Sequence, residues 1–374
     1  MQGENIPFSH KYAIRYYCFL IQQCIGLALA FWSHNMTLVM LFSIFHNVMA
    51  FLIPAKEPLD QKYAKQLNKS LAVMGPPIVS CLMTPVMLGI FWVHFDTLVG
   101  DSIANYLAAI ISLVFLIGGS IDAAHELLHR PETFCKVICF FNLFFYQFTV
   151  YPIEHLYLHH KNVGTPLDPI TSPKGMTIFQ YYVNAISSAY KFNYKHSKNI
   201  FFMCLGATIF YNVGVLSLTL HEGSGLYKAA FFSLFSYFSL FLMEATEYIE
   251  HYGLIYRESG DSQALEICSW NTVHNEYLSW ILFRFQKHSD HHMNAHKVYP
   301  VMELNEKMPC FPFDFGNAML FAPVPQLWFY LADPLVDEVI KKQALPKNHL
   351  KSVEKAVFYQ RALVTFLFLI VLAK

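Results

Sequence analysis

The chain has 374 residues, of which 55% are apolar, 17% aromatic and 14% charged. Soluble domains carry about 25% charged residues, so this composition indicates an integral membrane protein and excludes an ordinary soluble domain. The formal net charge is zero, and no basic tract or nucleic-acid module is present, which argues against a polynucleotide partner.

The apolar residues gather in stretches long enough to cross a bilayer, which takes about 20 mostly apolar helical residues. Six stretches predict transmembrane helices: 12–32, 36–54, 72–95, 103–124, 200–220 and 227–246. Two further apolar stretches, 135–151 and 362–373, are ambiguous, and the second is too short to cross. We therefore predict one all-α integral membrane domain over residues 1–374, with six transmembrane helices.

The N-terminus and the cysteines add two expectations. The opening residues MQGENIPFSHKYAIRYYCFL lack a basic segment, a short apolar segment and a cleavage site, so no secretory signal is predicted. Eight cysteines are scattered, mostly inside apolar runs and without a CxxC pair, and we interpret them as reduced packing residues.

The orientation follows from lysines in the loop between the second and third predicted spans, namely Lys56, Lys62, Lys65 and Lys69. The connections after the first and third spans carry no lysine or arginine. The positive-inside rule therefore places the lysine-rich loop on the cytosolic-type side. With six spans, the region after the fourth span and everything after the sixth share that side. The candidate membranes are the bacterial inner membrane, the endoplasmic reticulum membrane and the mitochondrial inner membrane.

Four histidine clusters fall on this predicted side. Their residues are His125 and His129 in HELLHR; His155, His159 and His160 in EHLYLHH; His251 in EATEYIEHYGL; and His288, His291 and His292 in QKHSDHHMNA. Most of these residues repeat a spacing of three or four, which places two imidazoles on one helix face, where they can bind one metal ion. A single pair of this kind is also typical of interfacial histidines at a helix end.

These clusters hold nine of the 18 histidines. We expect most of the others to be ordinary polar or interfacial residues: His10, His34, His46, His94, His196, His221, His274, His296 and His349. Nine imidazoles are too many for one four-coordinate zinc, but they suit two metal ions, each with an open position. Imidazole binds zinc, copper, iron or nickel, so the spacing predicts a dinuclear site without naming its metal.

The clusters can meet only if the chain returns to the side that it left after His129. The segment between His129 and His155 contains the apolar stretch 135–151. We therefore predict that this stretch lies along the membrane interface or re-enters the bilayer, and that it does not cross.

At this point the motifs resemble a known family. HELLHR, EHLYLHHKNVGTPLDP, EYIEHYGL and the spaced motif SWN…H…LF…QKHSDHH over 269–292 are similar, in order and approximate spacing, to the membrane alkane 1-monooxygenase family within the desaturase and hydroxylase superfamily. The similar region spans roughly 120–335 and includes the tail APVPQLWFYLADPLV. Ordinary acyl desaturases carry three histidine boxes and lack the EHYGL phrase.

The resemblance implies a six-helix fold that oxidises a terminal C–H bond of an alkane, alkyl or fatty acyl chain. It also implies dioxygen as the oxidant and an electron-donor protein of the rubredoxin or ferredoxin type. Two irons would be bound by His125, His129, His155, His159, His160, His251, His288, His291 and His292. Nearby carboxylates should orient the imidazoles, and the candidates are Glu126, Glu154, Glu247, Glu250 and Asp290, with Asp122 and Asp168 as weaker ones.

The chain departs from the family pattern at several positions. Leu128 and Leu158 stand where the family usually has glycine, and Glu247 replaces the usual asparagine of the phrase NYxEHYGL. The segment MPCFPFDFGNAM replaces an LPxGY-like segment, and the loop 54–71 looks unrelated. The substrate path or the donor-docking surface is therefore expected to differ.

Two alternatives stand beside the alkane monooxygenase. One is a desaturase or hydroxylase of fatty acyl lipids that uses the same site. The other is a non-catalytic scaffold, a lipid- or metal-binding subunit of a larger membrane complex. Retention of all nine histidines favours an enzyme.

Overall fold

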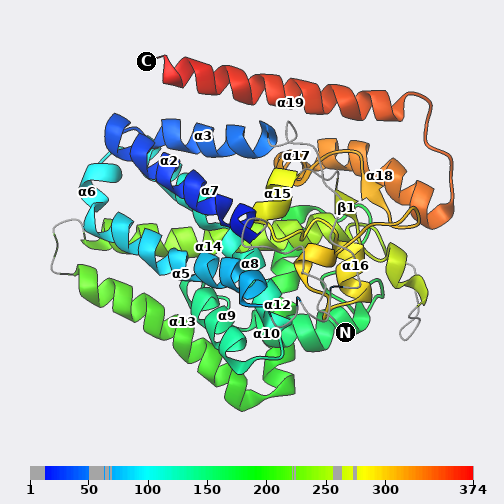
Figure 1. Cartoon of the computed structure of the whole chain (residues 1–374), viewed down its shortest axis with the longest axis horizontal. Coiled ribbons are helices and arrows are strands. Elements are labelled where there is room, and N and C mark those ends of the chain that lie inside the picture. Colours follow the sequence, from blue (N-terminus) through cyan, green and yellow to red (C-terminus); the bar gives the residue numbers. More distant parts are fainter. Residues whose placement is uncertain are drawn as a thin grey trace, which may run out of the picture. The chain divides into compact units, whose positions relative to one another are not determined.

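The computed structural model of the chain is almost entirely helical, as predicted (Figure 1). It describes residues 13–49, 63, 67, 70–220, 222, 225–255, 263–272 and 276–373. The four lysines of the loop 54–71, together with His10, His221 and His274, lie outside the described residues. The chain divides into two compact units. Unit 1 comprises Met1–Leu143, His274–Phe285 and Asn294–Glu303, and unit 2 comprises Phe144–Val273, Gln286–Met293 and Leu304–Lys374.

Unit 1 is a group of packed helices. Its elements are η1 (Ile14–Tyr17), α2 (Cys18–Ser33), α3 (Met36–Met49), α5 (Leu71–Val93), α6 (Phe95–Leu98), α7 (Ile103–Ile117), α8 (Gly119–Leu128), most of α9 (Thr133–Phe145), α15 (Glu276–Ile281) and η6 (Tyr299–Val301). Helix α3 packs along α7, and α5 packs along α8. Polar contacts also join helices here, because Thr84 Oγ1 donates to Asn142 Oδ1 over 2.8 Å and Asn142 Nδ2 donates to the Ser120 carbonyl over 2.9 Å.

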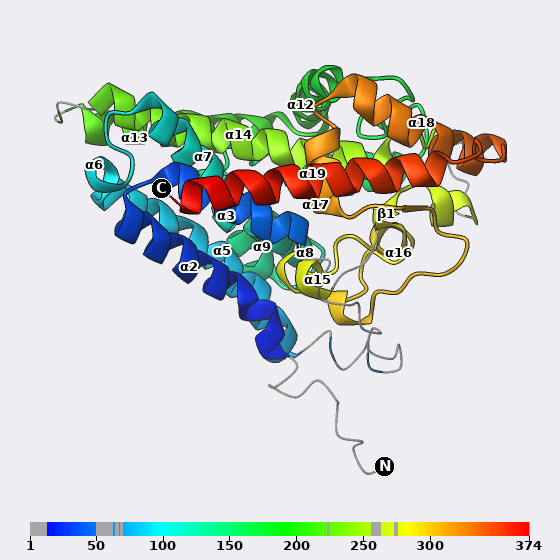
Figure 2. The ribbon, with the colours of Figure 1, turned by 90° about the horizontal axis from the view of Figure 1, so that it is seen from above.

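Unit 2 contains the remaining elements. They are α10 (Tyr151–Glu154), the π-turn η4 (His155–His159), α11 (His160–Asn162), α12 (Ile178–His196), α13 (Lys198–Thr219), α14 (Gly225–His251), η5 (Gln263–Ile267), β1 (Asn271–Thr272), α16 (His288–Met293), β2 (Cys310–Phe311), α17 (Phe315–Phe321), α18 (Pro325–Lys341) and α19 (His349–Leu372). Helices α13 and α14 run side by side (Figure 2). The two short strands pair in parallel, with Asn271 opposite Cys310.

Six described helices are long and apolar enough to cross a membrane, which confirms the predicted number. They are Ile14–Ser33, Leu71–Val93, Ile103–Leu128, Lys198–Thr219, Gly225–His251 and His349–Leu372. The first five agree with predicted spans, and the sixth does not. Five of the six predicted positions therefore hold.

The predicted span 36–54 appears as the 14-residue helix α3, and residues 50–54 lie outside the described residues. At 1.5 Å per residue its described part covers about 21 Å, less than the hydrocarbon core of about 30 Å. The stretch 362–373 was predicted to be too short to cross, and this was wrong. Helix α19 begins at His349 and has 24 residues, because its polar first turns, with Lys351 and Glu354, continue directly into the apolar run.

The stretch 135–151 contains no helix of spanning length. Helix α9 has 13 residues, about 20 Å of helix, and it ends before a turn in which Gln147 adopts φ 56°. Another helix, α10, begins only at Tyr151. This break supports the prediction that the stretch does not cross the bilayer.

Candidate metal centre

Four histidines of unit 2 form one compact, buried group: His159, His251, His288 and His292. Each offers a ring nitrogen, and the four nitrogens lie within 4.8 Å of one another. The Nε2 atom of His288 lies 3.0 Å from that of His251 and 2.9 Å from that of His292. The first three side chains are fully buried, and His292 is 6% exposed. Histidines that lie far apart in the sequence are therefore close together in the structure. We name these four residues the four-histidine group.

Three separate elements supply the residues of the four-histidine group. His159 is the last residue of the π-turn η4, and His251 is the last residue of α14. His288 and His292 lie one turn apart on α16.

Helix α16 is tied to the segment that contains β1 by buried polar contacts. The Ser289 amide donates to Asn271 Oδ1 over 3.1 Å, and Asn271 Nδ2 donates to Ser289 Oγ over 2.8 Å. Ser289 Oγ also donates to the Ser269 carbonyl over 2.9 Å. These contacts hold two of the four imidazoles in place although α16 has only six residues.

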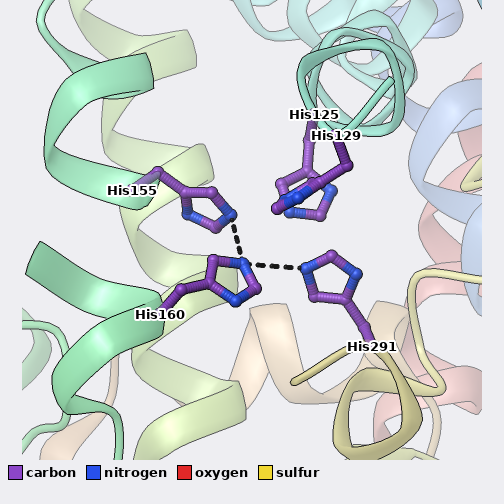
Figure 3. Close-up of side chains that lie close together, drawn as sticks. All are labelled: His125, His129, His155, His160 and His291. Atoms are coloured by element: carbon purple, nitrogen blue, oxygen red, sulfur yellow. Dashed lines mark hydrogen bonds between the residues drawn. The ribbon is translucent and has the colours of Figure 1, made fainter. Parts of the chain in front are cut away.

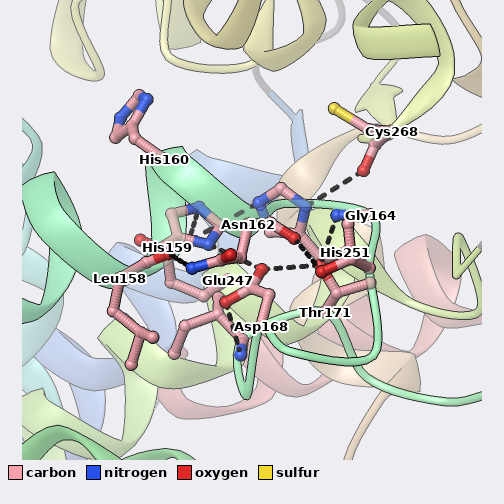
Figure 4. A network of polar contacts seen from close by, with 12 residues as sticks. Leu158, His159, His160, Asn162, Gly164, Asp168, Thr171, Glu247, His251 and Cys268 are labelled. Carbon is pink, nitrogen blue, oxygen red and sulfur yellow. Dashed lines mark hydrogen bonds and ion pairs between the residues drawn. The ribbon is translucent and has the colours of Figure 1, made fainter. Parts of the chain in front are cut away.

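The remote nitrogens of two of these rings are held by acceptors (Figure 4). His159 Nδ1 donates to Asp168 Oδ2 over 2.9 Å, and Thr171 Oγ1 donates to the same oxygen over 2.6 Å. His251 Nδ1 donates to the Cys268 carbonyl over 3.2 Å. An acceptor at Nδ1 leaves the Nε2 lone pair for a metal ion, which is the usual arrangement of a histidine ligand.

Two glutamates of α14, Glu247 and Glu250, offer carboxylate oxygens that lie, with a nitrogen of His288, within 4.8 Å of one another, but they approach different ring nitrogens. Glu250 Oε1 lies 3.4 Å from the remote Nδ1 of His288. Glu247 Oε2 instead lies 3.9 Å from His159 Nε2 and 3.8 Å from His251 Nε2. Glu250 therefore resembles an orienting carboxylate, whereas Glu247 faces the nitrogens that would bind an ion.

Burial sets the electrostatics of the site. Burial, reinforced by His288, His160, His159 and His251, holds the pKa of His292 well below its usual range, so its imidazole is neutral. Burial also lowers the pKa of His159, but Asp168 and then Glu247 outweigh it, and the pKa is raised.

Glu154 is buried among other acids. Burial, with Glu244, Asp168 and Glu247 nearby, raises the pKa of the Glu154 carboxyl well above its usual range. The raised pKa favours the protonated, neutral form of this carboxyl, and a cation bound nearby would favour its ionised form.

A second group of unit 2 comprises His155, His160 and His291 (Figure 3). His160 Nε2 lies 2.9 Å from His155 Nε2 and 3.1 Å from His291 Nε2. In unit 1, His125 and His129 lie at the C-terminal end of α8, with ring centroids 4.8 Å apart. The structure thus brings the predicted histidines together in separate sets within each unit.

The predicted carboxylates have different surroundings. Glu126 forms an ion pair of 2.6 Å with Arg130. Asp290 is buried on α16, and Asp122 is half-buried on α8. No described residue forms an ion pair with Glu154.

Asp168, a weaker candidate in the sequence, makes a carboxylate contact of 2.9 Å with His159 of the group. Asp168 follows His159 by nine residues, which is not the spacing of three or four that places two residues on one helix face. The only signal in the sequence was its place in the motif HHKNVGTPLDP.

Comparison with known proteins agrees with this geometry. The profile of the fatty acid desaturase family matches residues 101–301. An alkane 1-monooxygenase of Acinetobacter baylyi is 25% identical over 66% of this chain and 64% of its own length. An alkane 1-monooxygenase of Pseudomonas aeruginosa is 24% identical over 89% of this chain and 94% of its own length. The hydroxylase component of a xylene/toluene monooxygenase of Pseudomonas putida is 23% identical over 79% of this chain and 84% of its own length.

The chain therefore combines the desaturase-family profile with helices long enough to span a membrane and with histidine groups that could hold a metal ion. These relatives support an oxidoreductase.

Proposed function

The chain belongs to the fatty acid desaturase family, and from this premise we propose that it is a membrane di-iron monooxygenase that hydroxylates the terminal carbon of an alkane or another alkyl chain. One observation carries the proposal. The four-histidine group is buried, and His159 and His251 present Nε2 inward while acceptors hold their Nδ1 atoms. A buried set of imidazoles with oriented inner nitrogens suits a transition metal.

The donor atoms fit a single ion. Two nitrogens that each lie about 2.1 Å from one ion are at most about 4.2 Å apart, and about 3.4 Å apart in a tetrahedral site. The measured separations of 2.9 and 3.0 Å around His288 are closer to the value of about 3.0 Å for bonds at right angles. His159 Nε2 is buried and has no hydrogen-bond partner among the described residues. The set therefore suits a single transition-metal ion, and the resemblance to the alkane monooxygenases favours iron as that ion.

The second iron would be bound by His155, His160 and His291, together with His125 and His129. Support for the last two comes from their spacing of four and from the order of the motifs, which resembles that of the alkane monooxygenases. This assignment gives all nine predicted histidines a role.

The iron pair, when bound, supplies the activation of dioxygen that oxidation of an unactivated C–H bond requires. The overall reaction converts R–H, dioxygen, two electrons and two protons into R–OH and water, and we propose a donor protein of the rubredoxin or ferredoxin type for the electrons. The role of the chain is to keep the ligands in place. Asp168 retains the Nδ1 proton of His159, the Cys268 carbonyl retains that of His251, and burial excludes bulk water from the site.

We place the site at the cytosolic-type membrane face, on the strength of the lysines in the loop 54–71. The alkyl substrate would reach it from the bilayer. A desaturase or hydroxylase of fatty acyl lipids is the second candidate, favoured by the description of the family itself.

Product analysis separates these candidates. Purified protein would be given dioxygen, a reduced donor protein, and n-alkanes or fatty acids, followed by mass spectrometry of the products. A terminal alcohol supports the proposal, and a new double bond or a fatty acyl product supports the second candidate. His251→Ala and His288→Ala should abolish product formation while the helices remain folded, because packing of the helices stabilises the fold. The exposed His196 at the end of α12 gives the control variant His196→Ala, which should retain activity.

A further inference from the structure

We infer that Glu247 is itself a ligand of the metal ion in the four-histidine group, so that this ion has a mixed imidazole and carboxylate coordination. The inference rests on the proposed metal site, but not on the reaction that occurs there. It assigns to Glu247 a direct bond to the metal, in contrast to an orienting role like that of Asp168.

The distances carry this inference. Glu247 Oε2 lies 3.9 Å from His159 Nε2 and 3.8 Å from His251 Nε2. Both nitrogens are the inner atoms, because the Nδ1 atoms of these rings donate to Asp168 and to the Cys268 carbonyl. Ligand atoms of one ion, with bonds of about 2.1 Å, are at most about 4.2 Å apart. Both distances from Oε2 lie below this limit, as expected if one ion binds Oε2 and these nitrogens.

The carboxylate is also prepared for this role. Glu247 is 3% exposed, and its Oε2 has no hydrogen-bond partner within the described part of the chain. Its other oxygen, Oε1, accepts a hydrogen bond of 3.3 Å from the Tyr151 hydroxyl. The hydroxyl thus holds one oxygen and directs the other toward the imidazoles. A buried carboxylate oxygen without a hydrogen bond is costly unless a cation compensates it.

Position along the helix adds an independent reason. Glu247 and His251 are four residues apart on α14, so their side chains leave the same helix face. His251 is a proposed ligand, and its helical neighbour on that face is the carboxylate. The two residues form the same pair of positions that the HxxxH motifs use.

A carboxylate ligand would change the metal. One negative charge stabilises the more oxidised state, so the reduction potential should be lower than with imidazoles alone. A hard oxygen donor also favours iron or manganese over softer ions. The phrase NYxEHYGL carries a neutral asparagine at this position, so the added charge distinguishes this chain from the pattern that it otherwise resembles.

The test compares metal binding in two variants of Glu247 and in a matched control. Glu247→Gln keeps the shape and removes the charge, and Glu247→Asn introduces the residue of the family phrase. Glu244 lies one turn earlier on α14, is 2% exposed, and forms no ion pair with any described residue. Glu244→Gln therefore removes an equally buried carboxyl group for which no contact with the inner nitrogens is observed.

Ferrous iron would be titrated into each metal-depleted protein, followed by X-ray absorption at the iron edge and redox titration. We expect both Glu247 variants to lose one oxygen scatterer, to bind iron at least about tenfold more weakly, and to have a higher reduction potential. Glu244→Gln should keep the wild-type coordination. Unchanged coordination in Glu247→Gln, with a potential no more shifted than in Glu244→Gln, would overturn the inference.

Two further observations keep the test independent of folding and of the proposed reaction. Circular dichroism would confirm that each variant retains its helices. Glu247→Asp, which keeps the carboxylate, should bind iron more tightly than Glu247→Gln but more weakly than the wild type. If the wild type binds iron through Glu247 but yields no product, the proposed function fails and this inference stands.

Discussion

Buried acids have different partners in the two units. In unit 1, Glu126 lies 2.6 Å from Arg130. Glu276 lies 3.6 Å from Arg284, and both of these side chains are fully buried. Each of these carboxylates faces a guanidinium, which is charged at any physiological pH. Charge compensation in unit 1 is therefore built into the chain.

In unit 2 the acids beside the four-histidine group face imidazoles instead, whereas Asp314 pairs with Arg361 over 2.7 Å. Asp168 contacts His159, Glu250 contacts His288, and Glu247 lies near His159 and His251. An imidazole that binds a metal must be neutral, so these rings cannot compensate the carboxylates while they act as ligands. The two buried acids Glu126 and Glu276 of unit 1 are thus compensated by arginines of the chain, whereas the acids beside the four-histidine group lie where a bound cation would compensate them.

The largest expected effect is in unit 1. Arg284→Met should leave Glu276 buried without its partner, and breaking a buried pair costs about 3–5 kcal/mol. Arg284 also donates to the Tyr16 hydroxyl over 3.2 Å. Thermal unfolding in detergent, followed by circular dichroism, should show a clear loss of stability with or without iron. The double variant Glu276→Gln/Arg284→Met should recover much of that stability. If it recovers none, Arg284 does not compensate the charge of Glu276 and the contrast between the two units is wrong.

A smaller effect, on iron binding, is expected in unit 2. Asp168→Asn removes the carboxylate that holds His159, and such partners contribute about 10- to 100-fold to metal affinity. Metal-free protein should unfold almost as the wild type does, because the effect depends on the ion. An iron titration followed by spectroscopy measures the affinity. The prediction fails if stability falls equally with and without iron.

Thr171→Val should weaken the same contact less. The hydroxyl of Thr171 donates to Asp168 Oδ2 over 2.6 Å, and a hydrogen bond to a charged group contributes about 1.5–3 kcal/mol to local stability. Only part of this reaches His159, so we expect an iron affinity between those of the wild type and Asp168→Asn. An affinity below that of Asp168→Asn would show that Thr171 acts by another route.

The smallest effect concerns an exposed pair of unit 2. Hydrogen bonds and charge from Lys174, and then Lys341, lower the pKa of Asp337, and Lys174 Nζ lies 2.6 Å from Asp337 Oδ2. The folded-state pKa lies below the unfolded value, so the pair stabilises above the unfolded pKa and loses its contribution as pH falls through the folded one. Asp337→Asn should therefore lower the free energy of unfolding at neutral pH by less than about 1 kcal/mol, which a slightly lower unfolding temperature would report. At low pH the variant and the wild type should unfold alike.

The histidine pattern could be predicted from the sequence because it is local. A spacing of three or four on a helix already places His288 and His292, or Glu247 and His251, on one face. Their convergence with His159 was predicted from the topology of the spans and from the resemblance, and not from local spacing, because three separate elements supply these ligands.

Two features escaped prediction for physical reasons. Asp168 reaches His159 through a loop, and no periodicity predicts a loop contact. Helix α19 was underestimated because hydropathy recognises the apolar run 362–373 but not the polar helical turns that precede it.

The central claim is that nine histidines bind two irons, and the iron content of the purified protein tests it most directly. Protein from iron-supplied cells should contain about two irons per chain by elemental analysis, and the double variant His251→Ala/His288→Ala should keep about one, because imidazoles are the main ligands of each ion. Zinc alone in the wild type, no metal at all, or the same iron content in the double variant would contradict the account.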